Sequence, residues 1–416
     1  MPNPITDYLW RWRARFAWLA ARPIGVALVL GVVLRLTLYG MDRTFWLDEM
    51  SLRDNLSQRA AHDLFAGFTH NQLCPPAFFA TEWAMARVLG MGTMPLRLVP
   101  LLGGLAALFG FAALARRVLP AHSAWVAVLM FAVSGDLIVY ATEVKPYSTD
   151  VAAAVAVTLA GLAIASGPVS LWRFTGFTAL GAGLVWFSFP AALVLAGVGT
   201  SLIVSSVVHR DRPRALALIL TAAGWAVSFA AMRALAVRML GAEGSHGMQA
   251  FWVFAFPPWP PASWRDAAWP LREGVRLFVN PLDYHGPFGL WLSSLPAVSL
   301  FLAGALSLWR RDRRMLAMLL LPVLFAMGVA YPRLYPFHSR LVLFLVPALL
   351  LFIAEGTGLV WDLTRDRRLR AVVLASVLLV PTSRALYQLV EPGHGPMHNG
   401  VGDLRPWGDQ GQRFPF

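Results

Sequence analysis

The sequence predicts an all-α protein that crosses a membrane in about eleven helices, and three observations carry this prediction. Hydrophobic residues make up 57% of the chain and charged residues 14%, with a mean hydropathy of +0.59, a balance outside the range of soluble domains. Apolar runs recur from residue 24 to residue 383, most of them close to the roughly 20 residues that cross a hydrocarbon core as a helix. Arginines gather between these runs, as they do in cytoplasmic loops.

Residues 1–23 are expected to stay in the cytoplasm as a basic N-terminus. Four arginines precede the first span, residues 24–40, and no small-residue cleavage site follows it, so this span is predicted to be an uncleaved anchor. The formal net charge of +13 does not indicate a nucleic-acid partner, because the arginines form short clusters instead of one continuous face. Cys74 is the only cysteine, which excludes an internal disulfide and a cysteine metal cage.

One apolar stretch, residues 75–90, is not assigned as a span. It is short, and it contains Glu82 and Arg87, which are costly in the middle of a bilayer. A helix lying at the membrane interface within the first outer loop explains it better. With this choice every later arginine cluster falls on the cytoplasmic side, whereas counting the stretch as a span would invert them all. The clusters lie at residues 116–117, 173, 210–214, 310–314 and 365–370.

The remaining spans and the outer segments follow from this choice. We expect spans at residues 96–115, 122–141, 150–166, 174–188, 190–208, 215–234, 287–309, 315–331, 341–361 and 371–383. The membrane module is then 24–235, with C-terminal membrane helices in 287–383. The outside receives the loop 41–95, the turn 142–150, the loop 236–286, the turn 331–340 and the tail 384–416. The loop 236–286 is rich in Pro and Trp, which predicts extended chain near the headgroups.

The first outer loop brings two acids to the start of an amphipathic helix, Asp48 and Glu49. A purely structural interpretation makes Asp48 a helix N-cap and pairs Glu49 with Arg53 at i, i+4 spacing. A functional interpretation makes them site carboxylates at the membrane surface. The motif itself, with Trp46 and Leu47 beside the acids, favours the functional interpretation more for Asp48 than for Glu49.

The outer turn after the third span contains the only lysine of the chain, Lys145, in a protein that otherwise uses arginine. A compact ammonium in this position suggests a point contact with a phosphate. The alternative is an interfacial pair between Glu143 and Lys145 that binds no ligand.

A third polar turn, residues 331–340, lies between two strongly apolar spans on the same side. Arg340, at a helix start, could hold a lipid phosphate bidentately or anchor the span at the headgroups. Arg35 is a costly charge inside the first span, and it either extends outward or faces the site.

These motifs together resemble a bacterial family 39-type GT-C glycosyltransferase, in the branch of the aminoarabinose transferases for lipid A and the lipopolysaccharide galacturonosyltransferases. The resemblance rests on four segments and covers about residues 24–165 well. Cys74 departs from the pattern, where a bulkier apolar residue is usual. The segments are Phe45-Trp46-Leu47-Asp48-Glu49, His70-Asn71-Gln72-Leu73-Cys74-Pro75-Pro76, Glu143-Val144-Lys145-Pro146-Tyr147-Ser148 and Tyr335-Pro336-Phe337-His338-Ser339-Arg340.

The resemblance implies an inverting membrane glycosyltransferase that moves a sugar from a polyprenyl-phosphate donor to an extracytoplasmic acceptor. Asp48 would be the general base, with Glu49 and Glu143 as further catalytic acids. Lys145, Arg340 and Arg35 would bind the donor phosphate. The candidates for substrate binding are Arg53, His70, Tyr147, Tyr335 and His338.

The expected partners are the lipid-linked donor, membrane lipids and the acceptor, with the protein in a bacterial inner membrane and its site on the periplasmic face. No spacing demands a metal, although Asp48, Glu143 and His70 leave a divalent cation open. The competing hypothesis is a transporter or flippase of a lipid-linked sugar, which predicts ionisable residues deep in several spans and paired repeats. The polar motifs instead fall in outer turns, and no repeat is evident.

Overall fold

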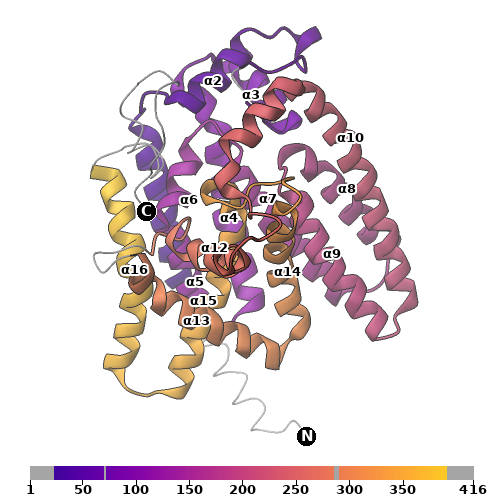
Figure 1. Cartoon of the computed structure of the whole chain (residues 1–416). Coiled ribbons are helices and arrows are strands. Elements are labelled where there is room, and N and C mark those ends of the chain that lie inside the picture. Colours follow the sequence, from indigo (N-terminus) through magenta and orange to yellow (C-terminus); the bar gives the residue numbers. More distant parts are fainter. Residues whose placement is uncertain (1–22, 70–71, 285–289, 391–416) are drawn as a thin grey trace, which may run out of the picture.

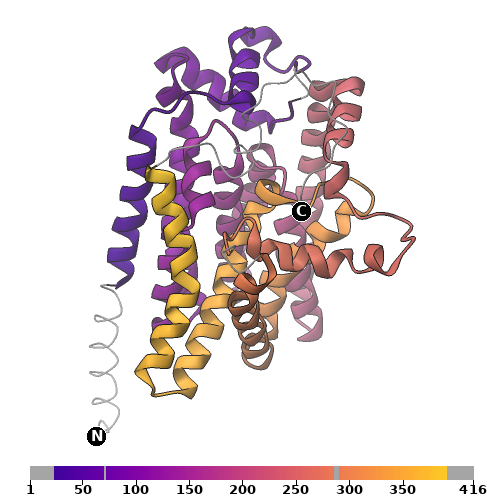
Figure 2. The same cartoon turned by 60° about the vertical axis from the view of Figure 1, so that its left-hand side comes forward.

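The computed structural model describes residues 23–69, 72–284 and 290–390 of the chain, and within these ranges all regular structure is helical. The predicted all-α class is confirmed. The longest helices run along one bundle direction, as Figures 1 and 2 show. The basic N-terminus, His70 and the predicted tail beyond residue 390 lie outside the described residues.

Among the described residues, eight helices are long and apolar enough to cross a membrane, and nine if one bent pair counts as a single span. The eight are Pro23–Gly40, α4 (Thr93–Val118), α7 (Tyr147–Ser166), α9 (Ala191–Val208), α10 (Arg212–Gly241 of Arg212–Phe251), α14 (Arg313–Ala330), η4 (Ser339–Leu345) joined to α15 (Val346–Leu363), and α16 (Arg367–Val390). The bent pair is α5 (Ala121–Ala132) with α6 (Gly135–Val139) and η2 (Tyr140–Thr142), at 60°.

A count of about eleven spans is therefore not confirmed. The other two expected positions are occupied by α8 (Leu171–Phe187) and α13 (Leu290–Arg311), which are helical but are not among these candidate spans. With 17 residues, α8 is one residue shorter than the shortest of these candidate spans.

The two ends of the bundle differ in character. At one end, which we call the first-loop end, lie α2 (Leu47–Ser57) and α3 (Pro76–Leu89), as Figure 1 shows. With 14 residues, α3 is too short to span, as expected for the apolar stretch of the first loop. The opposite, arginine end carries the tight turns α9–α10, α13–α14 and α15–α16, where three of the arginine clusters lie.

The loop between α10 and α13 contains more helix than expected. The α10 helix continues to Phe251 beyond a break at Gly241, whose φ is 70°, and η3 (Val253–Ala255), α11 (Trp264–Ala267) and α12 (Trp269–Val279) follow. The tryptophans divide between two environments. Trp259 and Trp264 are 67% and 75% exposed, whereas Trp252 and Trp269 are 3% and 1% exposed and belong to the protein core rather than to a headgroup layer.

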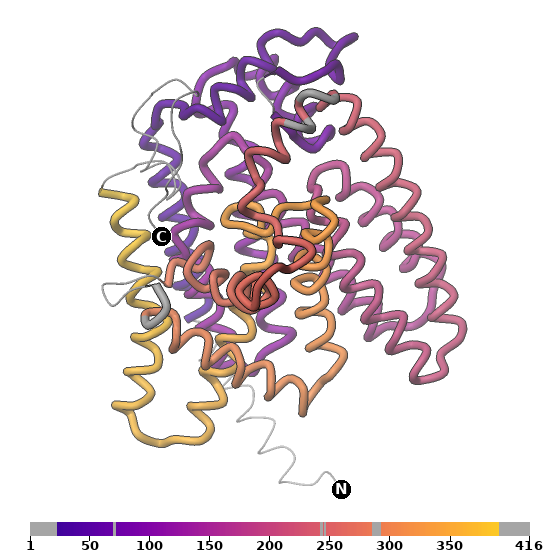
Figure 3. Tube along the Cα trace, viewed as in Figure 1, coloured from indigo at the N-terminus to yellow at the C-terminus, as the bar shows by residue number. Residues whose placement is uncertain are grey.

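The most deeply buried span is η4 with α15, and it presents the third polar turn to the centre of the bundle. Its close packing against α13 depends on two glycines. A Cβ added at Gly304 would lie 2.0 Å from the Phe352 carbonyl oxygen, and one at Gly356 would lie 2.0 Å from the Leu300 carbonyl oxygen. The two backbones therefore touch, which fixes the position of η4. The Cα trace in Figure 3 shows α15 inside the bundle and α16 at its edge.

The orientation of the bundle can be tested with single cysteines in a Cys74→Ser background, since Cys74 itself is 2% exposed. Gln58 is exposed at the first-loop end and His209 is exposed at the arginine end. We predict that Gln58→Cys reacts with a membrane-impermeant maleimide on intact spheroplasts, and that His209→Cys reacts only after permeabilisation. The reverse pattern would place the first-loop end in the cytoplasm.

Candidate active site

The candidate site is formed where α2, the turn after η2, the start of α7 and η4 meet. Its central contact joins residues 292 positions apart, since Nη2 of Arg340 donates to Oδ2 of Asp48 at 2.7 Å. The structure thus brings the first and third polar turns together. Tyr147, from the second turn, lies with its ring centroid 5.6 Å from the Arg340 guanidinium carbon.

The two acids of α2 have different surroundings. The helix N-cap is Trp46, so Asp48 is at the second helical position and the N-cap interpretation of Asp48 is wrong. Glu49, at the third position, accepts from the Trp46 backbone N–H at 3.3 Å, the usual reach of a third-position glutamate to a cap residue. Both acids also lie where the helix dipole favours negative charge.

Glu49 is fully buried and pairs with Arg97 of α4, not with Arg53. Nε and Nη2 of Arg97 donate to its two carboxylate oxygens at 2.9 and 2.7 Å, and the Val144 backbone N–H donates at 2.9 Å. Arg53 is exposed and packs on the Phe45 ring at 5.7 Å. The expected i, i+4 pair is therefore wrong. Glu49 fastens the start of α2 to α4 and to the second polar turn.

Arg340 is only 6% exposed, and Nε and Nη1 of its guanidinium have no hydrogen-bond partner among the described residues. Three aromatic rings surround it: Trp46 at 5.2 Å, Tyr147 at 5.6 Å and Trp252 at 5.9 Å. These cation–π contacts compensate part of the desolvation of the charge. Buried guanidinium donors are normally satisfied, so the open Nε and Nη1, which lie on the two edges of the guanidinium on either side of Nη2, indicate room for oxygen acceptors.

Glu143 is fully buried, and neither carboxylate oxygen has a partner within the described part of the chain. Burial raises the pKa of Glu143 to about 7, helped by the negative charge of Glu49 and opposed by Arg43 and Arg340. The alternative pair between Glu143 and Lys145 is not present. A carboxylate with a pKa near neutrality can both accept and hold a proton at physiological pH.

Lys145 is 6% exposed, and its Nζ donates to Oε1 of Gln72 at 2.6 Å. Gln72 belongs to the segment between α2 and α3, so this bond holds the first loop over the second polar turn. Lys145 and Tyr147 are two residues apart, and Tyr147 packs against Arg340. The second polar turn, which carries Lys145, therefore adjoins Arg340 through Tyr147.

The remaining predicted residues have other surroundings. Arg35 donates to the carbonyl oxygens of Gly31, Ala132 and Phe131, at 3.0, 3.3 and 3.4 Å. The Phe131 and Ala132 carbonyls are those left open where α5 breaks before α6. The described contacts of Arg35 do not join it to Lys145 or Arg340. The Tyr335 hydroxyl donates to the Leu341 carbonyl oxygen at 2.7 Å, within its own turn.

His338 packs its ring against Phe254 at 5.1 Å. Burial, together with the charges of Arg276 and Arg340, lowers the pKa of His338 to about 4. This histidine is therefore neutral at physiological pH, and it contributes shape and polarity to the turn without a charge.

Four residues that sequence reasoning did not select support the site: Arg43, Arg97, Gln72 and Trp252. Arg43 is 7% exposed, and its Nη2 donates to Oγ1 and the carbonyl oxygen of Thr142 at 2.7 and 3.2 Å. Arg97 carried a signal that could have found it, namely a charge at the start of an otherwise apolar span. No sequence signal marked Trp252, because its contact with Arg340 forms only when the loop between α10 and α13 folds against η4.

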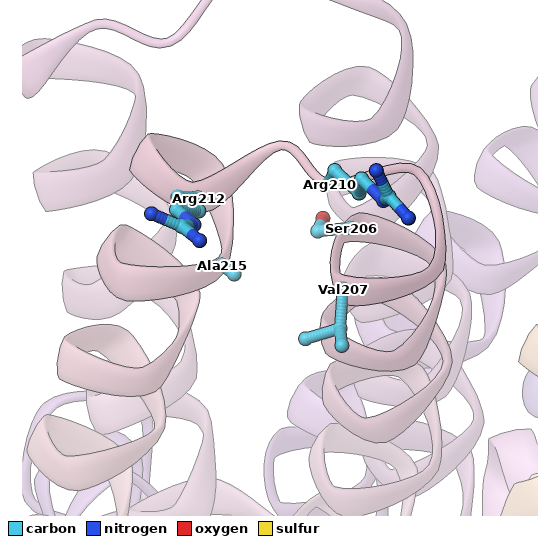
Figure 4. Close-up of a pocket in the computed structure, with 5 residues that line it drawn as sticks. All are labelled: Ser206, Val207, Arg210, Arg212 and Ala215. Atoms are coloured by element: carbon cyan, nitrogen blue, oxygen red, sulfur yellow. The ribbon is translucent and has the colours of Figure 1, made fainter.

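Within the described ranges, no group of three or more His, Cys, Asp or Glu side chains could hold a metal ion. A hollow at the arginine end, between α9 and α10, is lined by Ser206, Val207, Arg210, Arg212 and Ala215, as Figure 4 shows. It contains no acid. Its two arginines suit headgroup contact, and it is not a candidate active site.

Comparison with known proteins places this arrangement among solved folds. No family model matches the sequence, and no curated protein matches it. ArnT from Cupriavidus metallidurans is similar over 91% of this chain and 76% of its own in the apo state, with 15% identity and a TM-score of 0.55. Bound to undecaprenyl phosphate, it is similar over 90% and 76%, with 16% identity and a TM-score of 0.57.

The archaeal oligosaccharyltransferase AglB from Archaeoglobus fulgidus, in complex with an inhibitory peptide and a dolichol-phosphate, matches over 90% of this chain but only 56% of its own. Its identity is 14% and its TM-score 0.53. The chain thus spans little more than half of AglB and about three quarters of ArnT. At such low identities the likeness shows the fold: the chain has a GT-C-like helical membrane fold.

Proposed function

We propose that this protein is an integral membrane glycosyltransferase that transfers a sugar from a polyprenyl-phosphate donor to an acceptor on the extracytoplasmic face of a bacterial inner membrane. The observation that carries the proposal is Arg340, a buried guanidinium held by Asp48 and surrounded by aromatic side chains, with two nitrogens that have no partner in the described part of the chain. A phosphate ester supplies the oxygen acceptors that these nitrogens lack. Lys145 nearby supplies a second cation.

The structural likeness supports the choice of donor. One ArnT structure holds undecaprenyl phosphate, and the AglB structure holds a dolichol-phosphate. Both ligands are long isoprenoid chains that end in a phosphate. An equivalent ligand here would keep its chain in the bilayer while its phosphate reached the cations at the first-loop end.

The proposed reaction is an inverting transfer. An acceptor hydroxyl or amine attacks the anomeric carbon while the bond from that carbon to the phosphate oxygen breaks, and the phosphate leaves with the bonding electrons. Asp48 takes the acceptor proton as general base. Arg340 and Lys145 stabilise the charge that develops on the leaving phosphate, which lowers the barrier more than it strengthens substrate binding.

The Asp48–Arg340 pair links proton removal from the acceptor to stabilisation of the leaving phosphate. Arg340 uses Nη2 for Asp48, so either of its other two nitrogens, Nε on one edge or Nη1 on the other, can donate to a phosphate oxygen without releasing the base. Asp48 is 22% exposed, which leaves it open to an acceptor. Glu143 also interacts with Arg340 and therefore competes for the guanidinium that holds Asp48. Ionised Glu143 would weaken that hold and make Asp48 the stronger base.

The acceptor in this proposal is a lipopolysaccharide component such as lipid A, or another glycan, lipid or protein at the membrane surface. A transporter or flippase of a lipid-linked sugar is the competing function. Transport by inverted repeats places binding residues at the membrane midplane between paired repeats. Here Arg340 contacts Asp48 of α2, and Glu143, which has no hydrogen-bond partner among the described residues, interacts with Arg340 and with Glu49 of α2, which favours transfer chemistry over transport.

We predict that Asp48→Asn lowers kcat by about 100-fold or more with unchanged expression, because loss of a general base typically costs 10²–10⁴-fold. Turnover is measured with purified enzyme, a polyprenyl-phosphate sugar and a membrane extract, by the mass gained on the acceptor. Asp54→Asn, on the same helix, is the matched control and should retain full activity. Full activity in Asp48→Asn would transfer the role of base to Glu143 or Glu49.

The pKa of about 7 at Glu143 gives a second test. In the wild type, kcat/KM should rise as pH increases through about 7, because ionised Glu143 shares Arg340 and frees Asp48 as a base. Glu143→Gln should keep measurable turnover and lose this rise. A rise that persists in Glu143→Gln would mean that another group titrates, and complete inactivity of this variant at every pH would make Glu143 the base.

We further predict that Lys145→Ala lowers kcat more than it raises KM, since the leaving phosphate gains charge in the transition state. Lys145→Arg should rescue only part of the loss, because a planar fork does not replace a compact ammonium. Arg87→Ala, an exposed cation packed on Trp83, is the control. Direct use of a nucleotide sugar, with polyprenyl-phosphate sugars inert, would contradict the proposed donor.

A further inference from the structure

The hollow at the arginine end lies between two candidate membrane spans, α9 and α10, where the first ends and the second begins. Its volume is about 310 Å³. Figure 4 shows Arg210 and Arg212 on opposite sides of it. The buried part of its lining is formed by Ser206 and Ala215, which are 5% and 8% exposed. Because both of these side chains are small, the space between the two helix ends stays open.

The turn between α9 and α10 has a tight and specific backbone. The N–H of Arg210 donates to the Val207 carbonyl oxygen at 3.0 Å, and the N–H of Asp211 donates to the Ser206 carbonyl oxygen at 2.9 Å. These are the two bonds of a Schellman ending, in which the left-handed position is usually glycine. Here that position is Arg210, with a φ of 59°. An arginine is less stable than a glycine with this backbone, so the turn itself does not account for the side chain.

The charges of the two arginines in the hollow are not compensated. Arg210 and Arg212 are exposed, and neither forms an ion pair or a side-chain hydrogen bond with another described residue. The adjacent acid, Asp211, is already paired: its Oδ2 lies 3.0 Å from Nε of Arg214, and its Oδ1 accepts from the Arg214 backbone N–H at 3.2 Å. Arg214 also donates to three carbonyl oxygens at the C-terminal end of α7. The hollow therefore presents two guanidinium groups and no available carboxylate.

Exposed apolar side chains continue from the hollow along both helices. Val204 and Val207 of α9 are 54% and 60% exposed, and Leu216 and Leu220 of α10 are 60% and 64% exposed. Both helices are long and apolar enough to cross a membrane, so this surface is suited to acyl chains. A soluble anion would contact the arginines alone. A lipid would contact the arginines with its headgroup and the apolar surface with its chains.

From these features we propose that the hollow binds the phosphodiester headgroup of an anionic phospholipid, whose acyl chains lie along α9 and α10. The phosphate oxygens accept from Arg210 and Arg212, and the planar guanidinium suits phosphate geometry. Basic pockets between membrane helices bind anionic lipid headgroups in this way. A zwitterionic lipid would add a third cation, so a net negative headgroup is preferred. The hollow lies at the opposite end of the bundle from α2, and this lipid site is separate from the proposed active site.

The test measures lipid binding to the purified full-length protein, in an uncharged detergent, by native mass spectrometry. The probe is phosphatidylglycerol, and phosphatidylcholine with the same acyl chains is the zwitterionic comparison. We predict that the first phosphatidylglycerol binds at least about fivefold more tightly than phosphatidylcholine. Arg210→Gln and Arg212→Gln should each weaken phosphatidylglycerol by about fivefold, the usual contribution of one basic residue at an anionic lipid surface. Binding of phosphatidylcholine should change by less than about twofold.

Two further variants separate a built site from general positive charge. A double variant, Arg116→Gln with Arg117→Gln, removes two exposed arginines from the last turn of α4 at the same end of the bundle. It should leave phosphatidylglycerol affinity within about twofold of the wild type. Arg210→Gly removes the same charge as Arg210→Gln but suits the left-handed backbone. The lipid-free Arg210→Gly protein should unfold at an equal or higher temperature than the wild type, while its lipid binding is weakened as in Arg210→Gln.

Several results would overturn the proposal. Equal binding of the two lipids by the wild type, or an equal loss of phosphatidylglycerol in the α4 double variant, would mean diffuse attraction without a site. Unchanged binding in both Arg210→Gln and Arg212→Gln would place the lipid elsewhere. Displacement of phosphatidylglycerol by a similar concentration of glycerol phosphate would make the hollow a site for a soluble anion. None of these measurements involves sugar transfer, so the proposed function stands or falls separately.

Discussion

The Glu49 carboxylate is the contact on which the candidate site depends. Its oxygens accept from Arg97 on α4, from the Val144 backbone on the second polar turn and from the start of α2. One buried side chain thereby fixes three segments that the sequence separates by up to 95 positions. Because both members of the pair are almost fully buried, removal of either would leave an uncompensated charge, which costs several kcal/mol. Asp48, the residue before Glu49, is held in place by this fixed neighbour.

Burial gives the charges of this site their distinct properties. Glu49 is satisfied by Arg97 and acts as a structural anchor, whereas Glu143 lacks such a partner and its pKa rises to about 7. Arg340 is balanced by Asp48 and by aromatic faces and still keeps two donors open. The two glutamates therefore differ in role because the helices bring a cationic partner to Glu49 and not to Glu143. Unsatisfied groups mark the places where a ligand has to complete the structure.

The sequence allowed prediction of the membrane class, the peripheral short helix and the three turns that meet at the site. Span positions followed from apolar length and arginine clusters, because these reflect lipid and not neighbouring helices. The partners of individual charges did not follow. Glu49 was expected to contact Arg53 four residues away, and the actual partner, Arg97, comes from a helix 48 positions later. Local spacing cannot reveal such a pair, because long-range packing selects it.

The break between α5 and α6 is stabilised by the buried charge of Arg35, which thereby supports the candidate site. An unbroken helix would direct residues 136–143 along the bundle axis, whereas the 60° bend turns this segment away from it. The bend frees carbonyls at the end of α5, and Arg35 of the first helix donates to two of them, those of Phe131 and Ala132. A guanidinium in this position satisfies broken backbone where lipid offers no hydrogen bonds. Arg35 therefore supports the geometry that carries Tyr140 and Glu143, even though its own contacts lie away from Arg340.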